Sequence, residues 1–141
     1  MITNLLEDKP IPIYAKGENI RDWLYVEDCC QAIDLILHRG GVGEVYNVGG
    51  RSEYKNIDIA KKVIKTLAKS EDYIKFVPDR PGHDFRYALD ISKIRRELEW
   101  EPTLSFEKGL EATIKWYREN QWWWQPLKRR LERESKGFWT T

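Results

Sequence analysis

The stretch that decides the fold is Arg21-Asp22-Trp23-Leu24-Tyr25-Val26 (RDWLYV), which runs directly into Glu27 to His38 (EDCCQAIDLILH). The first part combines aromatic and branched side chains, a composition typical of a strand. The second part spaces Cys30, Ile33 and Leu37 as on one face of a helix. A strand that leads at once into an amphipathic helix predicts an α/β fold.

Further extended segments flank this unit on both sides. On the N-terminal side, Ile11 to Tyr14 is apolar, and prolines at 10 and 12 confine it to a sheet edge or to an isolated extended strand, because proline cannot donate to a ladder. On the C-terminal side, Glu44 to Gly50 predicts a buried strand that ends in a glycine turn. Ile74 to Val77 predicts another strand, and Tyr87 to Leu89 a short extended piece.

Three more helices are predicted from capping residues and apolar spacing. Their expected N-caps are Asn56 for the first, Asp90 or Ser92 for a brief helix to about Leu98, and Ser105 for the last. The expected apolar faces are Ile57, Ala60, Ile64 and Leu67 on the first helix and Phe106, Leu110, Ile114 and Tyr117 on the last. Beyond Asn120 the pattern changes, and a polar stretch follows from Lys128 to Lys136. The element order predicts a mixed α/β domain with a small sheet.

The composition excludes several classes of protein. The chain has 141 residues, enough for one domain, with 24 basic and 23 acidic side chains. This near-neutral charge argues against nucleic acid or a membrane surface as the main partner. The N-terminus lacks the apolar core of a signal peptide, and no run reaches membrane-spanning length. The adjacent Cys29 and Cys30 are interpreted as small buried residues at a helix start, which suits a reducing, cytoplasmic compartment.

Two arginines stand in restrained positions. Pro81 pushes Arg80 towards an extended backbone, and Gly82 allows a turn or the close approach of a ligand. A guanidinium held in such a loop suits bidentate binding of a phosphate or carboxylate. Arg21 opens the predicted strand at 21–26, where we expect its head group to lie at a pocket rim. Surface ion pairs with neighbouring aspartates are the competing interpretation of both arginines.

The residues for independent catalysis are missing from the sequence. It has no G-x-G-x-x-G after a strand, no Walker A loop and no Tyr-x-x-x-Lys pair. His38 is interpreted as a structural residue at a helix end. Asn47 lies inside an apolar run, where its amide faces a ligand or stabilises a turn. Taken alone, the residues leave anion binding and surface ion pairs both open for the two arginines and indicate no reaction.

Four strings extend this interpretation: Tyr14 to Gly17 (YAKG), Ile20 to Asp28 (IRDWLYVED), Tyr46 to Gly50 (YNVGG) and Asp79 to Ala88 (DRPGHDFRYA). Their order and spacing resemble the C-terminal part of dTDP-glucose 4,6-dehydratases, extended short-chain dehydrogenases that act on nucleotide sugars. Leu98 to Pro102 (LEWEP) and the Trp116-Tyr117 pair extend the resemblance, which covers residues 1–126.

The resemblance implies a small mixed α/β domain over residues 1–126 that binds a nucleotide sugar, followed by a polar tail over 127–141. In the family this domain packs on an N-terminal Rossmann domain, which holds NAD and the catalytic residues and has no counterpart in this sequence. The chain begins at what looks like an internal methionine of such an enzyme. The family reaction oxidises C4 of dTDP-glucose, eliminates water across C5 and C6, and returns hydride to C6, giving dTDP-4-keto-6-deoxyglucose. We therefore expect no cofactor, metal or catalytic residue on this chain and no activity from it alone.

The resemblance also implies which residues contact the nucleotide sugar. It places Pro12, Ile13 and Tyr14 near the base and Arg21 and Arg80 at the diphosphate. The remaining implied contacts are Asn47, Asp79, Pro81, Gly82 and His83.

Two positions depart from the family pattern. Ala15 stands where the family has a glycine, so the backbone there is expected to be strained or shifted if it needs a positive φ. Glu99 replaces a glycine that ends a helix in the family, and we expect this change to affect stability only.

Two other functions remain open at this point. The first is the corresponding part of a UDP-sugar epimerase or decarboxylase. The second is a non-enzymatic interaction module in which Trp122 to Trp124 form an exposed patch, the alternative being that these tryptophans pack on the last helix or on the missing domain. Loss of the Rossmann domain also predicts self-association through the face it leaves exposed.

Overall fold

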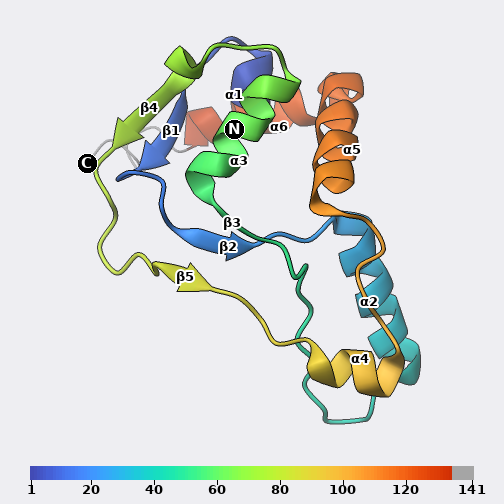
Figure 1. Cartoon of the computed structure of the whole chain (residues 1–141). Coiled ribbons are helices and arrows are strands. Elements are labelled where there is room, and N and C mark those ends of the chain that lie inside the picture. Colours follow the sequence, from blue (N-terminus) through green and yellow to red (C-terminus); the bar gives the residue numbers. More distant parts are fainter. Residues whose placement is uncertain (135–141) are drawn as a thin grey trace.

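The computed structural model describes residues 1–134, which form helices and short strands in a mixed order (Figure 1). The helices are α1 (Ile2–Leu6), α2 (Val26–Arg39), α3 (Asn56–Thr66), the 3₁₀ turn η1 (Glu71–Tyr73), α4 (Ser92–Leu98), α5 (Phe106–Glu119) and α6 (Gln121–Glu134). The strands are β1 (Ile11–Tyr14), β2 (Ile20–Asp22), β3 (Glu53–Lys55), β4 (Ile74–Val77) and β5 (Arg86–Tyr87). The predicted mixed α/β class is confirmed.

The strands form two small sheets. β1 pairs in parallel with β4, with Ile11 opposite Ile74 and Tyr14 opposite Val77. This sheet has two strands, so β1 is an edge strand, as its prolines predict. In the second sheet β2 is central, antiparallel to β3 and parallel to β5. The predicted strand at 21–26 is therefore shorter than expected, because pairing stops at Asp22.

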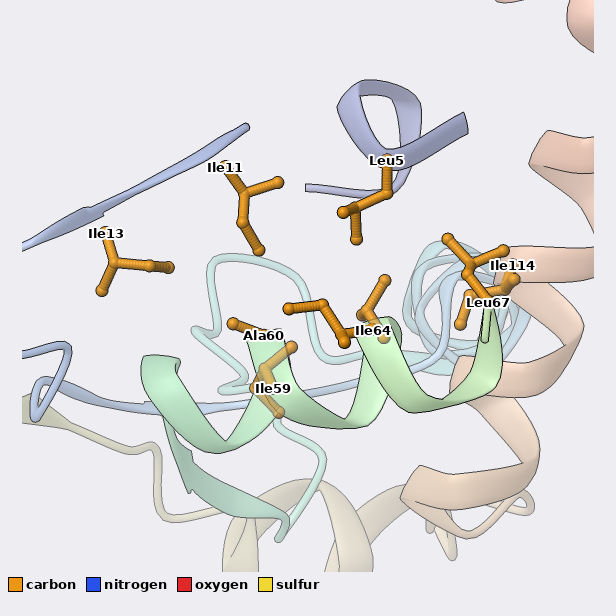
Figure 2. Close-up of a cluster of buried hydrophobic side chains, with 9 residues drawn as sticks. Leu5, Ile11, Ile13, Ile59, Ala60, Ile64, Leu67 and Ile114 are labelled. Atoms are coloured by element: carbon orange, nitrogen blue, oxygen red, sulfur yellow. The ribbon is translucent and has the colours of Figure 1, made fainter. Parts of the chain in front are cut away.

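The larger core lies between the first sheet and the helices (Figure 2). Alternate residues of β1, Ile11 and Ile13, point into it, and α1, α3 and α5 cover it. Its buried members are Leu5, Ile11, Ile13, Ile59, Ala60, Val63, Ile64, Leu67 and Ile114. The predicted face of α3 is confirmed at Ala60, Ile64 and Leu67, whereas Ile57 is only half-buried.

A second, smaller core joins α2 to α4. It contains Ala32 of α2 and Ile91, Ile94, Leu98 and Trp100 from the α4 region. The predicted caps hold in part. Ser105 accepts a hydrogen bond from the Lys108 amide at 3.5 Å, as predicted. The N-cap of α4 is Ile91 and not Asp90 or Ser92, although the Asp90 carboxylate accepts from the Ser92 amide at 2.8 Å. Asn56 is the first residue of α3 and Lys55 precedes it as N-cap, without a side-chain hydrogen bond.

The predicted apolar face of α2 is wrong. Ile33 is 59% exposed and Leu37 78%, and Cys30 is exposed as well. The helix instead buries the opposite residues Asp28 and Ala32, because α4 and the segment before α5 lie on that side. The expectation that both cysteines are buried is also wrong, since Cys29 is only half-buried.

The predicted strand at 44–50 is absent. Residues 45–50 have no regular secondary structure, and Val45 is 77% exposed. The composition suits a buried strand, but a strand forms only with a neighbour to complete its ladder. None of the strands within residues 1–134 pairs with this segment.

A helix that the sequence analysis missed, α6, follows α5 after a break at Asn120. It continues through Pro126, so the predicted boundary between 126 and 127 falls inside a helix. Trp124 is 3% exposed and its indole N–H donates to the Tyr117 carbonyl at 2.7 Å. Trp122 is 73% exposed, so the three tryptophans do not form one patch. In the described part of the chain, no helix is both long and apolar enough to cross a membrane.

Candidate functional site

Arg21 lies in the central strand of the second sheet and is half-buried. Its Nη1 donates to the Ile20 carbonyl at 2.6 Å, and its Nη2 donates to the Asp84 carbonyl at 2.9 Å. Its Cζ atom lies 4.3 Å from the centre of the Tyr87 ring. These contacts use backbone oxygens and a neutral ring, so the positive charge of Arg21 has no carboxylate partner among residues 1–134. The competing interpretation of Arg21 as a surface ion pair is therefore wrong.

The loop from Asp79 to Asp84 is fixed at two points. At its start, Asp79 Oδ1 lies 2.7 Å from His83 Nδ1. Because an ionised carboxylate only accepts, the ring carries its proton on Nδ1. The hydrogen bond from His83 lowers the pKa of Asp79 below its usual value. At its end, the Asp84 carbonyl accepts from Arg21 and, at 3.1 Å, from the Asn19 amide.

Arg80 lies between these two anchors and is exposed. Its backbone N–H donates to Asp79 Oδ1 at 3.0 Å, so Asp79 holds both sides of the turn. Within residues 1–134 the Arg80 guanidinium makes no ion pair or hydrogen bond. Gly82 has a φ of 67° with open space around its Cα, a backbone that other residues adopt only with strain. The loop therefore presents a free cation on a restrained backbone.

The three residues predicted near the base lie on β1. Tyr14 is 39% exposed, and its ring meets the His83 ring edge-to-face at 5.8 Å between centroids. Pro12 is exposed, whereas the Ile13 side chain is 2% exposed and belongs to the core. A ligand beside β1 therefore has the faces of Tyr14 and Pro12 available, and only the backbone of Ile13. Ala15, which follows, has a φ of 47°, so the predicted backbone strain is present.

Asn47 lies away from these contacts. Its Nδ2 donates to the Asp90 carbonyl at 3.2 Å, and the residue is exposed rather than buried in a strand. The following turn is held by Asp22, whose carboxylate accepts from the Gly50 amide at 3.0 Å and the Ser52 amide at 2.8 Å. Asp22 thus joins the strand that carries Arg21 to the segment that carries Asn47.

The structure therefore brings together Tyr14, Arg21 and the Asp79 to His83 loop, with Asn47 linked through the Asp22 turn. Sequence reasoning missed the residues that hold them, namely Asn19, the Asp84 carbonyl and Tyr87. The identity of Asn19 carries no signal for this role. Tyr87 could have been found from strand pairing, because it lies opposite Arg21 in the parallel register of β2 and β5.

The residues present do not fit NAD. A dinucleotide diphosphate needs a glycine turn between a strand and a helix, where backbone N–H groups approach the phosphates. Here β2 enters α2 through Trp23, Leu24 and Tyr25, and β3 adjoins α3 directly. We therefore assign NAD no site among residues 1–134. Across residues 1–134, no cluster of three or more His, Cys, Asp or Glu side chains is arranged to hold a metal ion.

Comparisons with known proteins cover most of the chain. Residues 1–113 match the family model described as GDP-mannose 4,6 dehydratase. A dTDP-glucose 4,6-dehydratase from Streptomyces niveus is 48% identical over 126 residues, which cover 89% of this chain and 38% of that relative. The chain thus spans less than half the length of the curated relatives that it matches.

Solved structures of relatives share the fold. A dTDP-glucose 4,6-dehydratase from Bacillus anthracis, solved with NAD, superposes with a TM-score of 0.83 at 48% identity, covering 89% of this chain and 40% of that one. The enzyme from Streptomyces venezuelae gives a TM-score of 0.85 at 43% identity, covering 89% and 39%. That structure holds NAD and the ligand TYD, and a structure of a double mutant of the same enzyme holds NAD and the ligand DAU. On the strength of the family match and these relatives, the chain belongs to the GDP-mannose 4,6-dehydratase family, as a portion akin to part of the dTDP-glucose 4,6-dehydratases.

Proposed function

We propose that this chain is the nucleotide-sugar-binding portion of a dTDP-glucose 4,6-dehydratase and that Arg21 and Arg80 bind the diphosphate of dTDP-glucose. The observation that carries the proposal is the restrained loop from Asp79 to Asp84. The Asp84 carbonyl ties it to Arg21, and it presents Arg80 without a carboxylate partner among residues 1–134. The dTDP-type ligands of the Streptomyces venezuelae relative support the choice of nucleotide.

The two guanidinium groups suit a diphosphate on physical grounds. Arg21 has five N–H donors, and the two described hydrogen bonds leave the others for a ligand. A planar fork binds phosphate oxygens in pairs, and hydrogen bonds to charged groups are the strong ones. Because the Asp79–His83 contact already restrains the loop, binding costs less ordering of Arg80.

The proposed base site lies beside β1. The Tyr14 ring is partly exposed and held edge-on by His83, so one face remains for stacking on a flat base. Pro12 on the same side of the strand adds apolar surface, and Pro81 and Gly82 shape the loop. Asn47 keeps its Oδ1 available to accept a hydrogen bond from the ligand, since its described contact uses Nδ2.

We also propose that the chain does not convert dTDP-glucose by itself. The support is in the sequence, which lacks a Tyr-x-x-x-Lys pair and a dinucleotide fingerprint. Incubation of the chain with dTDP-glucose and NAD, followed by product chromatography, tests this. Any formation of a 4-keto-6-deoxy sugar would refute the proposal.

Calorimetric titration of the chain with dTDP tests the binding site. We expect binding by the wild type and a loss of about 10- to 100-fold in affinity for Arg80→Ala, the range for one hydrogen-bonded charge. The matched control is Arg129→Ala, an exposed arginine on α6 that is expected to bind as wild type. No binding by the wild type, or equal losses in both variants, would overturn the site. Tighter binding of UDP than of dTDP would favour a UDP-sugar enzyme instead.

We further propose that the chain self-associates through the exposed face of α2. Val26, Ile33 and Leu37 are all more than half exposed on this helix. An apolar groove of about 770 Å³ adjoins its first turn, with Trp23, Tyr25, Phe106, Trp116 and Trp123 in its lining. Contiguous apolar surface of this kind is uncommon on monomers.

A further inference from the structure

Tyr87 contacts Arg21 but is not among the residues that the resemblance places against the nucleotide sugar. It lies on β5, is 55% exposed, and its ring centre lies 4.3 Å from the Arg21 Cζ. A guanidinium at this distance from an aromatic face makes a cation–π contact. Within residues 1–134, the Tyr87 hydroxyl makes no hydrogen bond. The ring, and not the hydroxyl, is therefore the part that contacts Arg21.

The sheet register fixes this contact. In the parallel pair of β2 and β5, Arg21 lies directly opposite Tyr87, and opposite residues in a ladder project on the same face. β5 has only two residues, so pairing alone holds it weakly. Arg86 reinforces it, because its Nε and Nη2 each donate to one Glu53 carboxylate oxygen at 2.7 Å. That bidentate pair connects β5 to β3 on the far side of β2.

The consequence for Arg21 is a fixed orientation. Its two terminal nitrogens are held by the Ile20 and Asp84 carbonyls, and its Cζ atom lies over the Tyr87 ring. An arginine side chain otherwise carries considerable rotamer freedom, which it must give up when it binds an anion. The ring and the two carbonyls remove that freedom before the anion arrives.

We propose that Tyr87 is a positioning residue that orients Arg21 for the diphosphate, an inference that rests on the proposed function. Tyr87 does not touch the phosphate in this arrangement and acts through the Arg21 guanidinium. Because the aromatic ring performs this role, we expect phenylalanine at position 87 to keep Arg21 oriented and an aliphatic residue to lose that orientation.

The test combines two measurements on the intact chain. The first follows the Arg21 Nε–H signal by ¹⁵N NMR. The nearby Tyr87 ring displaces the chemical shift of this signal, and an ordered Arg21 side chain exchanges its Nε proton with water more slowly. The second is calorimetric titration with dTDP. We expect Tyr87→Leu to remove the displacement of the Arg21 signal and to weaken dTDP binding about two- to fivefold. Tyr87→Phe is expected to retain both properties of the wild type.

Phe85→Leu is the matched control, because Phe85 is an aromatic residue of the same segment that is also more than half exposed. If Tyr87→Leu fails to fold, Tyr87→Thr replaces it, since threonine suits an exposed strand. An unchanged Arg21 signal in the aliphatic variant, or a changed signal with wild-type affinity, overturns the inference. If the wild type binds no dTDP, the proposed diphosphate site is wrong, and the Arg21 signal still decides whether Tyr87 orients the guanidinium.

Discussion

Asp28 shows how one residue can hold two parts of the molecule together. It is 1% exposed, and its carboxylate accepts from the Thr103 hydroxyl at 2.5 Å and from the Thr103 and Leu104 amides at 3.1 and 3.2 Å. Burial alone raises the pKa of a carboxyl, but these three donors outweigh it, so the pKa of Asp28 lies below its usual value. The charged form of Asp28 thus fastens α2 to the segment that enters α5.

We expect Asp28→Asn to lower the free energy of unfolding by about 1–3 kcal/mol, because an amide cannot accept from all three donors. Asp34→Asn on the same helix is the control, since its side chain is 76% exposed and is expected to change stability by less than about 0.5 kcal/mol. Urea denaturation at neutral pH measures both. Equal effects of the two substitutions would contradict the role given to Asp28.

The same contact predicts a pH dependence. A carboxyl whose pKa is depressed on folding contributes stability above its unfolded pKa of about 3.9 and loses it as the pH falls through the folded value. The stability difference between wild type and Asp28→Asn is therefore expected to be full at pH 6 and to shrink below about pH 4. Denaturation at a series of pH values measures it, and a difference that grows in acid would be inconsistent with this mechanism.

The sequence was enough to select Arg21 and Arg80 as candidate anion-binding residues, but it did not show which groups these side chains contact. Arg21 and Arg80 stood out because proline, glycine and a strand restrain them. The partners that orient Arg21 are a backbone carbonyl and a ring on another strand, and only the register of β2 and β5 brings them near. Ile13 illustrates the converse. The resemblance placed it by the ligand, whereas its side chain lies in the core.

Among the secondary-structure elements, the segment between α2 and β3 depends on tertiary contacts for its shape. Its turn rests on the Asp22 carboxylate and packs tightly against the chain before α2. A Cβ added to Gly50 would lie 1.8 Å from the Trp23 carbonyl oxygen, a distance that requires the backbone to move. The close approach at Gly50 thus fixes the path of the segment that carries Asn47.

We expect Gly50→Ala to destabilise the protein by about 2–3 kcal/mol, as overpacked sites do. Gly82→Ala is the comparison, because the space around Gly82 is open and only its φ of 67° opposes a side chain. That cost is about 1 kcal/mol. Thermal unfolding of both variants measures the difference, and a smaller effect at Gly50 than at Gly82 would refute the tight packing.

Elements with their own periodicity were predictable, and those that depend on a neighbour were not. α3 and α5 carry clear apolar spacing, and both form where expected. The segment at 44–50 has strand composition but no partner strand among residues 1–134. α6 was missed because Pro126 and a run of tryptophans mask its helical character. Pro126 lies inside the helix, where proline removes a backbone hydrogen bond and crowds the preceding turn, so its presence argued against a helix there.

At the scale of the whole molecule, the exposed face of α2 is apolar although no part of the core covers it. We expect the chain to form dimers or larger species at high concentration, and Leu37→Lys to shift it towards monomer by placing a charge in the contact. Asp34→Lys, on the same helix at an exposed polar position, is expected to change the distribution little. Sedimentation velocity over a range of concentrations measures this. A wild type that stays monomeric throughout would rule out the contact.

The contact between α1 and α6 has a consequence for synthesis. Lys128 donates to Asn4 at 2.7 Å and to Glu7 at 2.8 Å, and Lys9 lies 3.3 Å from Glu132. These pairs are separated by more than 120 residues of chain, so the first helix cannot complete its contacts until nearly all the described chain has been translated. During synthesis, α1 can therefore pack with α3 and α5 before it gains its hydrogen bonds to α6.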